Sequence, residues 1–241
     1  LAKKALNEIS PNENIEELIS DISNEKVDTS ENIFQLKYRL SLLLTFFIAS
    51  FNQLSGINAF LYYAPRIFEE AGLGESTALL SSVGIGLINL IFTFIGISLI
   101  DKLGRKQLMY FGSFGYIISL SLVSIAFFLK LNPILIPIFL FVFIASHAIG
   151  QGTVIWVFIS EIYPNHLRSS GQSFGSSVHW VLAAIIPSMI PILFSSIGAG
   201  FVFSFFSFMM VLQLIFVYYL MPETKGISLE ELSKVLTKKR H

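Results

Sequence analysis

Residues 169–222, SSGQSFGSSVHWVLAAIIPSMIPILFSSIGAGFVFSFFSFMMVLQLIFVYYLMP, contain no charged side chain. About 20 apolar residues span the hydrocarbon core of a bilayer, so a charge-free run of 54 residues can cross it twice. We expect the chain to reverse at residues 195–200, SSIGAG, where small, flexible residues permit a turn at the membrane interface.

Four further stretches also lack Asp, Glu, Lys and Arg, namely residues 40–65, 76–100, 107–129 and 131–160. Each is long enough for one span. The helices are therefore expected at about 40–63, 77–100, 107–129, 133–158, 172–194 and 200–221. The sequence predicts an all-α transmembrane fold, a six-helix bundle over residues 40–221.

The composition supports a membrane protein. Of the 241 residues, 13% are charged and 54% are hydrophobic, whereas roughly a quarter of the residues of a soluble domain are charged. The 16 basic and 16 acidic residues balance, which argues against a nucleic-acid partner. The chain has no Cys, which excludes disulfides, thiol catalysis and thiolate metal sites, and we expect no cofactor.

The segments that flank the bundle are polar. Residues 1–39 are expected to lie at the cytosolic surface, with a short amphipathic helix after Asn14, and residues 222–241 are expected to form a cytosolic tail whose helix begins at Ser228. This arrangement places 14 of the 16 basic residues in the cytosol and only Arg66 and Lys130 outside, as the positive-inside rule requires. Both termini are then cytosolic. Since the chain starts at Leu1 without a signal peptide, we expect it to begin inside a longer protein.

Several uncharged polar residues interrupt the apolar spans. They are Asn52, Gln53, Ser55, Asn58, Asn89, His147, Gln151, Gln172, His179 and Gln213. Buried amides and imidazoles need hydrogen-bond partners, and carboxamides both donate and accept, which suits an uncharged ligand with many hydroxyl groups. Trp156 and Trp180 add flat apolar faces for the C–H side of a sugar ring. These residues favour a carbohydrate over an ion.

Alternative interpretations of these residues stay open. Asn89 and Gln213 could simply bond between helices, and Trp180 could only pack. His147 and His179 could ligate a metal, but no carboxylate or thiol accompanies them, so we expect no metal site.

The first span holds the strongest indication of a binding site. On a straight helix Gln53 and Asn58 would lie about 140° apart, so they converge only if the helix breaks near Gly56. Broken helices at mid-membrane form binding sites in secondary transporters. Gly150 and Gly152 permit a second break in the fourth span.

Five motifs resemble the sugar-porter branch of the major facilitator superfamily in order and spacing. They are residues 53–63 (QLSGINAFLYY), 101–106 (DKLGRK), Trp156 with 161–164 (EIYP), Arg168, and 222–226 (PETKG). The chain resembles only the second half of such a protein, helices seven to twelve. Its motif sequences are most similar to those of bacterial xylose–proton or hexose–proton symporters. The resemblance implies a bacterial inner-membrane location, a missing N-terminal six-helix half, and residues 1–39 as the end of the central cytosolic loop.

The resemblance also implies roles for individual residues. Gln53, Asn58, Asn89 and Trp156 match sugar-contacting positions, whereas Asn52, His147 and His179, which precedes Trp180, depart from the usual residues but keep hydrogen-bonding ability. The implied sugar-contacting set is Asn52, Gln53, Asn58, Asn89, His147, Trp156, His179 and Trp180. Tyr62 and Tyr63 match the aromatic pair of the extracellular gate.

A second implied site is a cytosolic charge network. Its members are Asp101, Arg105, Lys106, Glu161 and Arg168. Ion pairs among them would hold the cytosolic helix ends together in the outward-open state, although charges at these positions could also do no more than enforce topology.

The expected function is transport of a hexose or pentose by alternating access, with proton coupling implied by the resemblance. The expected partners are a monosaccharide, the lipid bilayer, protons and the missing half. One alternative is a half-transporter that acts as a homodimer or a structural membrane module. The other is a membrane enzyme that uses His147 and His179, but no carboxylate lies at their depth, so we expect no enzyme.

Overall fold

The computed structural model describes residue 16 and residues 31–227, 231–232 and 236. The chain divides into two units, Leu1–Asn32 and Ile33–His241, and the helices described below belong to the second. The surface helices expected after Asn14 and after Ser228 fall mostly on residues outside this set.

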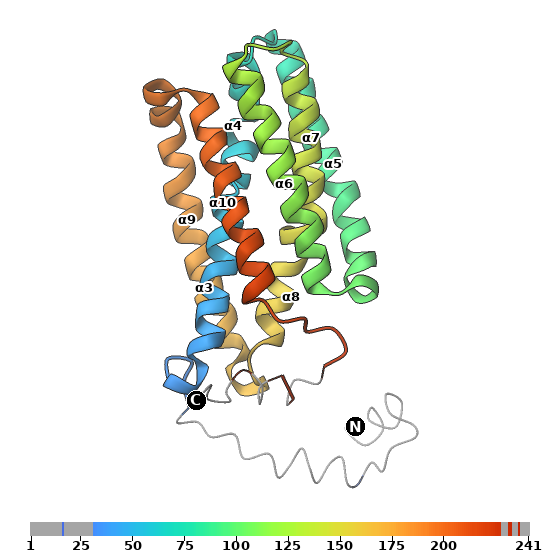
Figure 1. The fold of residues 1–241 in the computed structure, drawn as a ribbon, viewed down its shortest axis with the longest axis vertical. Coiled ribbons are helices and arrows are strands. Elements are labelled where there is room, and N and C mark those ends of the chain that lie inside the picture. Colours follow the sequence, from blue (N-terminus) through green and yellow to red (C-terminus); the bar gives the residue numbers. More distant parts are fainter. Residues whose placement is uncertain (1–15, 17–30, 228–230, 233–235, 237–241) are drawn as a thin grey trace. The chain divides into compact units, whose positions relative to one another are not determined.

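The described part of the second unit is a bundle of helices (Figure 1). In chain order the elements are η1 (Leu36–Tyr38), α3 (Arg39–Leu54), α4 (Ile57–Glu70), α5 (Glu75–Leu103), α6 (Arg105–Phe128), α7 (Leu135–His147), η2 (Ala148–Gly152), α8 (Thr153–Glu161), η3 (Asn165–Leu167), α9 (Arg168–Ile197) and α10 (Ala199–Tyr219). Within the described residues they make six segments long and apolar enough to cross a membrane. The all-α fold with six spans is confirmed, and the chain reverses between α9 and α10 at Gly198, inside the predicted turn.

Most spans extend beyond their predicted ends. The first continues through α4 to Glu70, and the fifth already begins at η3, before Arg168. Charge-free runs report how much of a helix lies in hydrocarbon, whereas backbone hydrogen bonds continue into the polar interface where charged side chains are tolerated.

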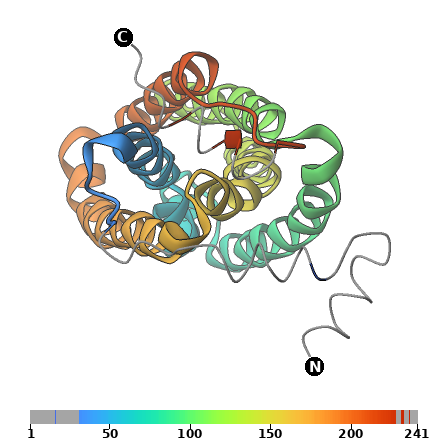
Figure 2. The same cartoon turned by 90° about the horizontal axis from the view of Figure 1, so that it is seen from below.

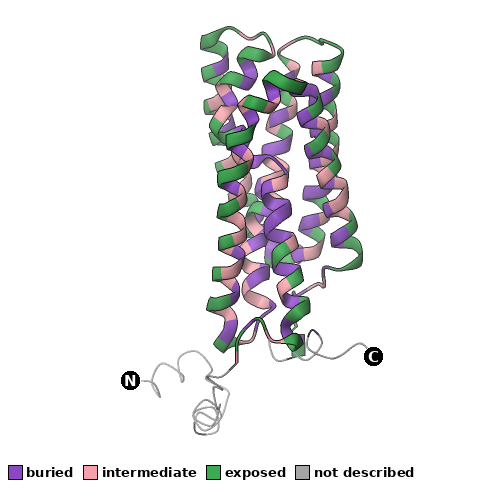
Figure 3. Ribbon diagram, turned by 90° about the vertical axis from the view of Figure 1, so that its left-hand side faces the viewer, coloured by how far each residue is buried: buried purple, intermediate pink, exposed green. Residues whose placement is uncertain are grey.

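The spans differ in how deeply they lie in the bundle (Figure 2). In the first span 67% of the most apolar stretch is buried, against 17% in α5 and 22% in α9. Large apolar side chains of α5, such as Leu80 and Val83, are exposed. Figure 3 shows exposed residues along the outside of the bundle. Such a surface suits contact with lipid or with other transmembrane helices.

The first span breaks at Gly56, as the sequence predicts. Gly56 adopts a left-handed conformation with φ of 83° between α3 and α4. A Cβ atom at this position would also lie 2.8 Å from the Phe206 ring of α10. The Ser55 hydroxyl donates to the Asn52 carbonyl (2.6 Å) and accepts from the Ile57 N–H (3.3 Å), so it satisfies backbone groups that the break frees.

We expect Gly56→Ala to lower the free energy of unfolding by about 2 kcal/mol, because alanine is strained in the left-handed region and its methyl group meets Phe206. The matched control is Gly86→Ala in α5, where nothing lies within 4 Å of the added carbon. Thermal unfolding in detergent measures both variants. Equal midpoints for the two would show that the break does not depend on glycine.

The fourth span is irregular where the sequence suggests a break, but the helix does not stop there. Ala148–Gly152 forms one wider π-helical turn, η2, between α7 and α8. The Thr153 hydroxyl donates to the Ala148 carbonyl over 2.6 Å, which satisfies an acceptor that the wider turn would otherwise leave open.

Candidate functional site

The break at Gly56 brings together three amide side chains from the two halves of the first span. The Asn58 Nδ2 at the start of α4 donates to the Gln53 Oε1 over 3.0 Å, and the Gln53 Nε2 donates to the Asn52 Oδ1 over 3.0 Å. Asn52 and Gln53 are buried, whereas Asn58 is half-buried. The predicted convergence of Gln53 and Asn58 is confirmed.

Helix α9 adds an imidazole between two indoles. The Gln53 Nε2 lies 3.2 Å from each ring nitrogen of His179, and the His179 ring centroid lies 5.2 Å from those of Trp156 and Trp180. Trp156 is half-buried, but Trp180 is 62% exposed. We call Asn52, Gln53, Asn58 and His179 the amide cluster. Its partly open polar side chains and aromatic faces can bind a neutral ligand rich in hydroxyl groups.

The other residues of the expected sugar site lie apart from these contacts. His147 bonds through Nδ1 to the Tyr116 hydroxyl of α6. Asn89 is half-buried on α5, where its backbone carbonyl accepts from the Thr93 hydroxyl. Tyr62 and Tyr63 lie on α4 beyond the break, one exposed and one half-buried. No hydrogen bond or ring contact among the described residues joins these four to the amide cluster.

Two buried glutamines outside the expected site continue the hydrogen bonding inward. Gln151 in η2 accepts from Asn52 over 3.5 Å and donates to the Gln213 Oε1 of α10 over 2.8 Å. Gln213 therefore bonds between helices, which was one of its two interpretations. In the sequence, Gln151 and Gln213 stand out only as amide residues inside apolar spans. The sequence does not indicate which side chain each of them hydrogen-bonds.

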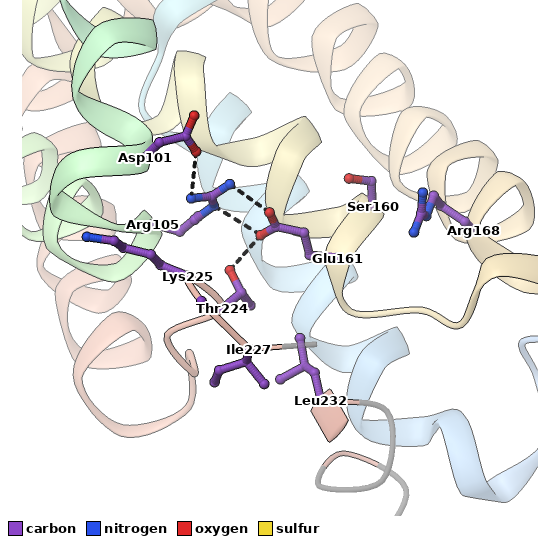
Figure 4. Close-up of a pocket in the computed structure, with 10 residues that line it drawn as sticks. Asp101, Arg105, Ser160, Glu161, Arg168, Thr224, Lys225, Ile227 and Leu232 are labelled. Atoms are coloured by element: carbon purple, nitrogen blue, oxygen red, sulfur yellow. Dashed lines mark hydrogen bonds and ion pairs between the residues drawn. The ribbon is translucent and has the colours of Figure 1, made fainter. Parts of the chain in front are cut away.

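At one end of the bundle, charged side chains from α5, α6 and α8 meet (Figure 4). The Arg105 guanidinium binds Glu161 at two points, with Nη2 2.7 Å from Oε1 and Nε 3.1 Å from Oε2. It also pairs with Asp101 over 3.2 Å. The side chains of Arg105 and Glu161 are 11% and 22% exposed, against 82% for Asp101, so the pair with Glu161 carries most of the interaction energy.

Glu223, absent from the expected charge network, is central to the same end. Its carboxylate accepts from the backbone N–H groups of Arg105 (2.9 Å) and Lys106 (3.0 Å) at the start of α6. Because helix N-termini carry unsatisfied N–H groups and a partial positive charge, a carboxylate stabilises them. Gly104, with φ of 93°, has no room for a side chain here, since a Cβ would lie 2.6 Å from Glu223. We call Asp101, Arg105, Glu161 and Glu223 the charged cluster.

The surroundings of Glu223 lower the pKa of its carboxyl group. Partial burial alone would raise the pKa of this carboxyl, but backbone N–H groups of Lys225, Arg105, Lys106 and Thr224 outweigh burial and hold the pKa below its usual value of 4.5. Because the pKa of Glu223 is lower in the folded than in the unfolded protein, its ionised carboxylate stabilises the fold at pH values above the unfolded-state pKa. This stabilisation is lost as the pH falls through the folded-state pKa.

We therefore expect Glu223→Gln to reduce the thermal midpoint near neutral pH, because an amide offers one acceptor where the carboxylate offers two. The difference from the unsubstituted protein should vanish as the pH falls below 4.5 and Glu223 becomes protonated. Thermal unfolding in detergent across this pH range measures it, with the exposed Glu75→Gln as control. A difference that persists unchanged into acid would contradict this account.

A cavity of about 620 Å³ adjoins the charged cluster, and Arg168 and Thr224 line it. The Thr224 hydroxyl donates to Glu161 over 2.6 Å. Arg168, expected in the charge network, donates to the Asn165 side chain over 2.8 Å, and the Lys106 Nζ donates to the Tyr218 carbonyl over 3.2 Å. The structure thus brings Asp101, Arg105 and Glu161 into direct contact and leaves Arg168 and Lys106 at the periphery.

The described residues contain no group of three or more His, Asp or Glu side chains that could hold a metal ion. Instead, His147 contacts the Tyr116 side chain and His179 contacts the Gln53 side chain.

Comparison with known proteins gives consistent matches. Residues 1–236 match the family described as "Sugar (and other) transporter". The chain is 33% identical to the arabinose-proton symporter of Bacillus subtilis over 227 residues, which cover 94% of this chain and 49% of that protein. A structure of the proton:xylose symporter XylE bound to 6-bromo-6-deoxy-D-glucose aligns with a TM-score of 0.74 and 32% identity, over 81% of this chain and 42% of that one.

A crystal structure of XylE mutants with two introduced tryptophans aligns with a TM-score of 0.85 and 28% identity, over 97% of this chain and 51% of that one. The chain thus spans about half the length of the curated relatives it matches.

Proposed function

The chain belongs to the sugar (and other) transporter family, and we propose that it forms the C-terminal six-helix half of a hexose or pentose transporter. With its six apolar helices it is a multi-pass membrane protein. The observation that carries the proposal is the meeting of Gln53, Asn58 and His179 beside Trp156 at a helix break inside the membrane. Uncharged amides and aromatic faces match the hydroxyl groups and C–H faces of a monosaccharide.

Part of the amide cluster is accessible in this unit, and the proposed N-terminal half would cover that part. Asn58, Trp156 and His179 are each half-buried, although they lie within apolar spans. The length of the relatives supports a second six-helix half, which would complete the binding cleft. Alternating access would then follow from rocking of the two halves about the sugar.

Proton coupling and orientation are part of the proposal. The names of the relatives, an arabinose-proton symporter and a proton:xylose symporter, support pentose uptake driven by protons. Since the charge-free runs of this chain hold no carboxylate, the coupling acid would belong to the other half. The positive-inside bias favours cytosolic termini. The similarity to a bacterial xylose transporter supports a bacterial inner membrane.

We expect Asn58→Ala and Trp156→Ala in the complete transporter each to raise the apparent Michaelis constant for radiolabelled xylose or arabinose about tenfold or more. The first removes a hydrogen-bonding amide at the open edge of the amide cluster and the second removes an aromatic face. Uptake into proteoliposomes with a proton gradient is the measurement. Near-normal uptake by both variants would contradict the proposed site.

A further inference from the structure

Five hydrogen bonds run in one continuous line, two within the amide cluster and three from it to the interior of α6 and α10. In each bond a side-chain amide donates to the side-chain oxygen of the next residue, in the order Asn58, Gln53, Asn52, Gln151, Gln213, Ser113. The donor–acceptor distances along this line are 3.0, 3.0, 3.5, 2.8 and 2.8 Å. All five donors point the same way, and we call the line the amide relay.

The inner members of the amide relay are sealed from solvent. Gln151, Gln213 and Ser113 are each 0% exposed, and Asn52 is 3% exposed. Because a buried amide without a partner is unfavourable, these groups must satisfy one another. Turning one amide over would place two carbonyl oxygens, or two N–H groups, face to face on either side of it, so the orientations are fixed together.

A backbone group fixes the direction of the amide relay. The Gln151 Nε2 lies 3.4 Å from the Ile48 carbonyl of α3, and a carbonyl can only accept. Gln151 must therefore turn its N–H groups toward Ile48 and Gln213, which leaves its oxygen for Asn52. Asn52 in turn presents its own oxygen to Gln53.

This direction decides what the open end offers to a ligand. Gln53 uses one N–H for Asn52 and directs its nitrogen toward His179, so only its oxygen remains available, and that oxygen already accepts from Asn58. Asn58 keeps its own oxygen and one N–H. The free lone pairs at the open end are one on the Gln53 oxygen and two on the Asn58 oxygen, against one N–H of Asn58 and one ring N–H of His179, so acceptors exceed donors there.

We propose that Gln151 and Gln213 are positioning residues that hold the amide cluster in this acceptor-rich orientation, and that the site thereby selects hydroxyl groups that donate. The inference rests on the proposed function, because it specifies how the same site recognises its sugar. Neither glutamine touches the sugar. They act through Asn52, which the amide relay holds in one orientation.

The test uses the complete transporter and a series of monodeoxy and monodeoxyfluoro xylose analogues. Fluorine can accept weakly but cannot donate, so in the unsubstituted protein both analogues at the contacting position should bind at least tenfold more weakly than xylose. With Gln151→Leu, Asn52 loses its acceptor and the link to the Ile48 carbonyl is removed, so the outer amides can turn. We expect xylose affinity to fall about tenfold and discrimination against the fluoro analogue to shrink below about threefold, with the maximal transport rate within about twofold.

Two further variants separate orientation from folding. Gln151→Leu combined with Gln213→Leu removes both buried partners, which avoids a lone unsatisfied amide, and should show the same loss of discrimination. Ser207→Ala is the matched control, since Ser207 is a buried polar residue of α10 that bonds to Ser121 of α6 outside the amide relay. It should keep full discrimination.

Unchanged discrimination in both leucine variants would overturn the inference while leaving sugar transport intact. If the unsubstituted transporter binds no monosaccharide at all, the proposed function itself fails and the inference fails with it.

Discussion

Gln53→Leu is expected to weaken monosaccharide binding by the complete transporter about a hundredfold. Gln53 is the only member of the amide cluster that contacts the other three, and it is 1% exposed. Leucine has a similar volume but neither donates nor accepts, so Asn52 and Asn58 lose their shared partner and the sugar loses an acceptor. A site that leaves buried polar groups unpaired discriminates strongly, and a hundredfold corresponds to about 2.7 kcal/mol.

Equilibrium binding of radiolabelled xylose to the purified transporter measures this change. The control is Gln107→Leu, the same substitution at an exposed position of α6 far from the amide cluster in the sequence. Binding within threefold of normal in Gln53→Leu would mean that the sugar does not lie at the helix break.

Glu161→Ala is expected to lower the free energy of unfolding by about 2 kcal/mol and to slow sugar uptake at least tenfold. The substitution leaves the guanidinium of Arg105, only 11% exposed, without its two-point partner. Removing one member of a largely buried ion pair is unfavourable because the remaining charge is not resolvated. The proposed sugar site is elsewhere, so xylose affinity should stay within about threefold.

The matched control for Glu161→Ala is Asp101→Asn, which removes the other carboxylate bound to the same arginine. Asp101 is 82% exposed, and ion pairs of this kind contribute about 0.5 kcal/mol. Thermal unfolding and uptake, measured on both variants, compare the two carboxylates directly. If Asp101→Asn is as damaging as Glu161→Ala, burial does not determine the strength of this cluster.

The sequence predicts the spans well because the bilayer imposes a single requirement on them. Any stretch in hydrocarbon must be apolar and must satisfy its own backbone, so charge-free length gives the six helices. The small residues at 195–200 give the turn near Gly198. The break at Gly56 was also predictable, since Gln53 and Asn58 could share a site only if the helix turned between them.

What the sequence does not give is the partner of each polar side chain. Gln151 and Gln213 lie 62 residues apart, and Glu223 lies 118 residues from the helix end that it caps. Such pairs depend on how the helices pack, which charge patterns and periodicity do not encode. The π-helical turn of η2 was likewise not predicted. Gly150 and Gly152 suggested a break in the helix, whereas the structure has a continuous helix with one wider turn.

The central claim, that a monosaccharide binds beside the amide cluster, can be tested by labelling a single introduced thiol, since this chain contributes no Cys and any Cys in the other half can be replaced. Ser176→Cys places a thiol on α9 one turn before His179, on the same helix face. Ser76→Cys, at the exposed start of α5, serves as control. In the complete transporter, xylose or arabinose should slow maleimide labelling at position 176 and leave position 76 unchanged. Equal labelling rates at position 176 with and without saturating sugar, in a transporter that still takes up that sugar, would contradict the account.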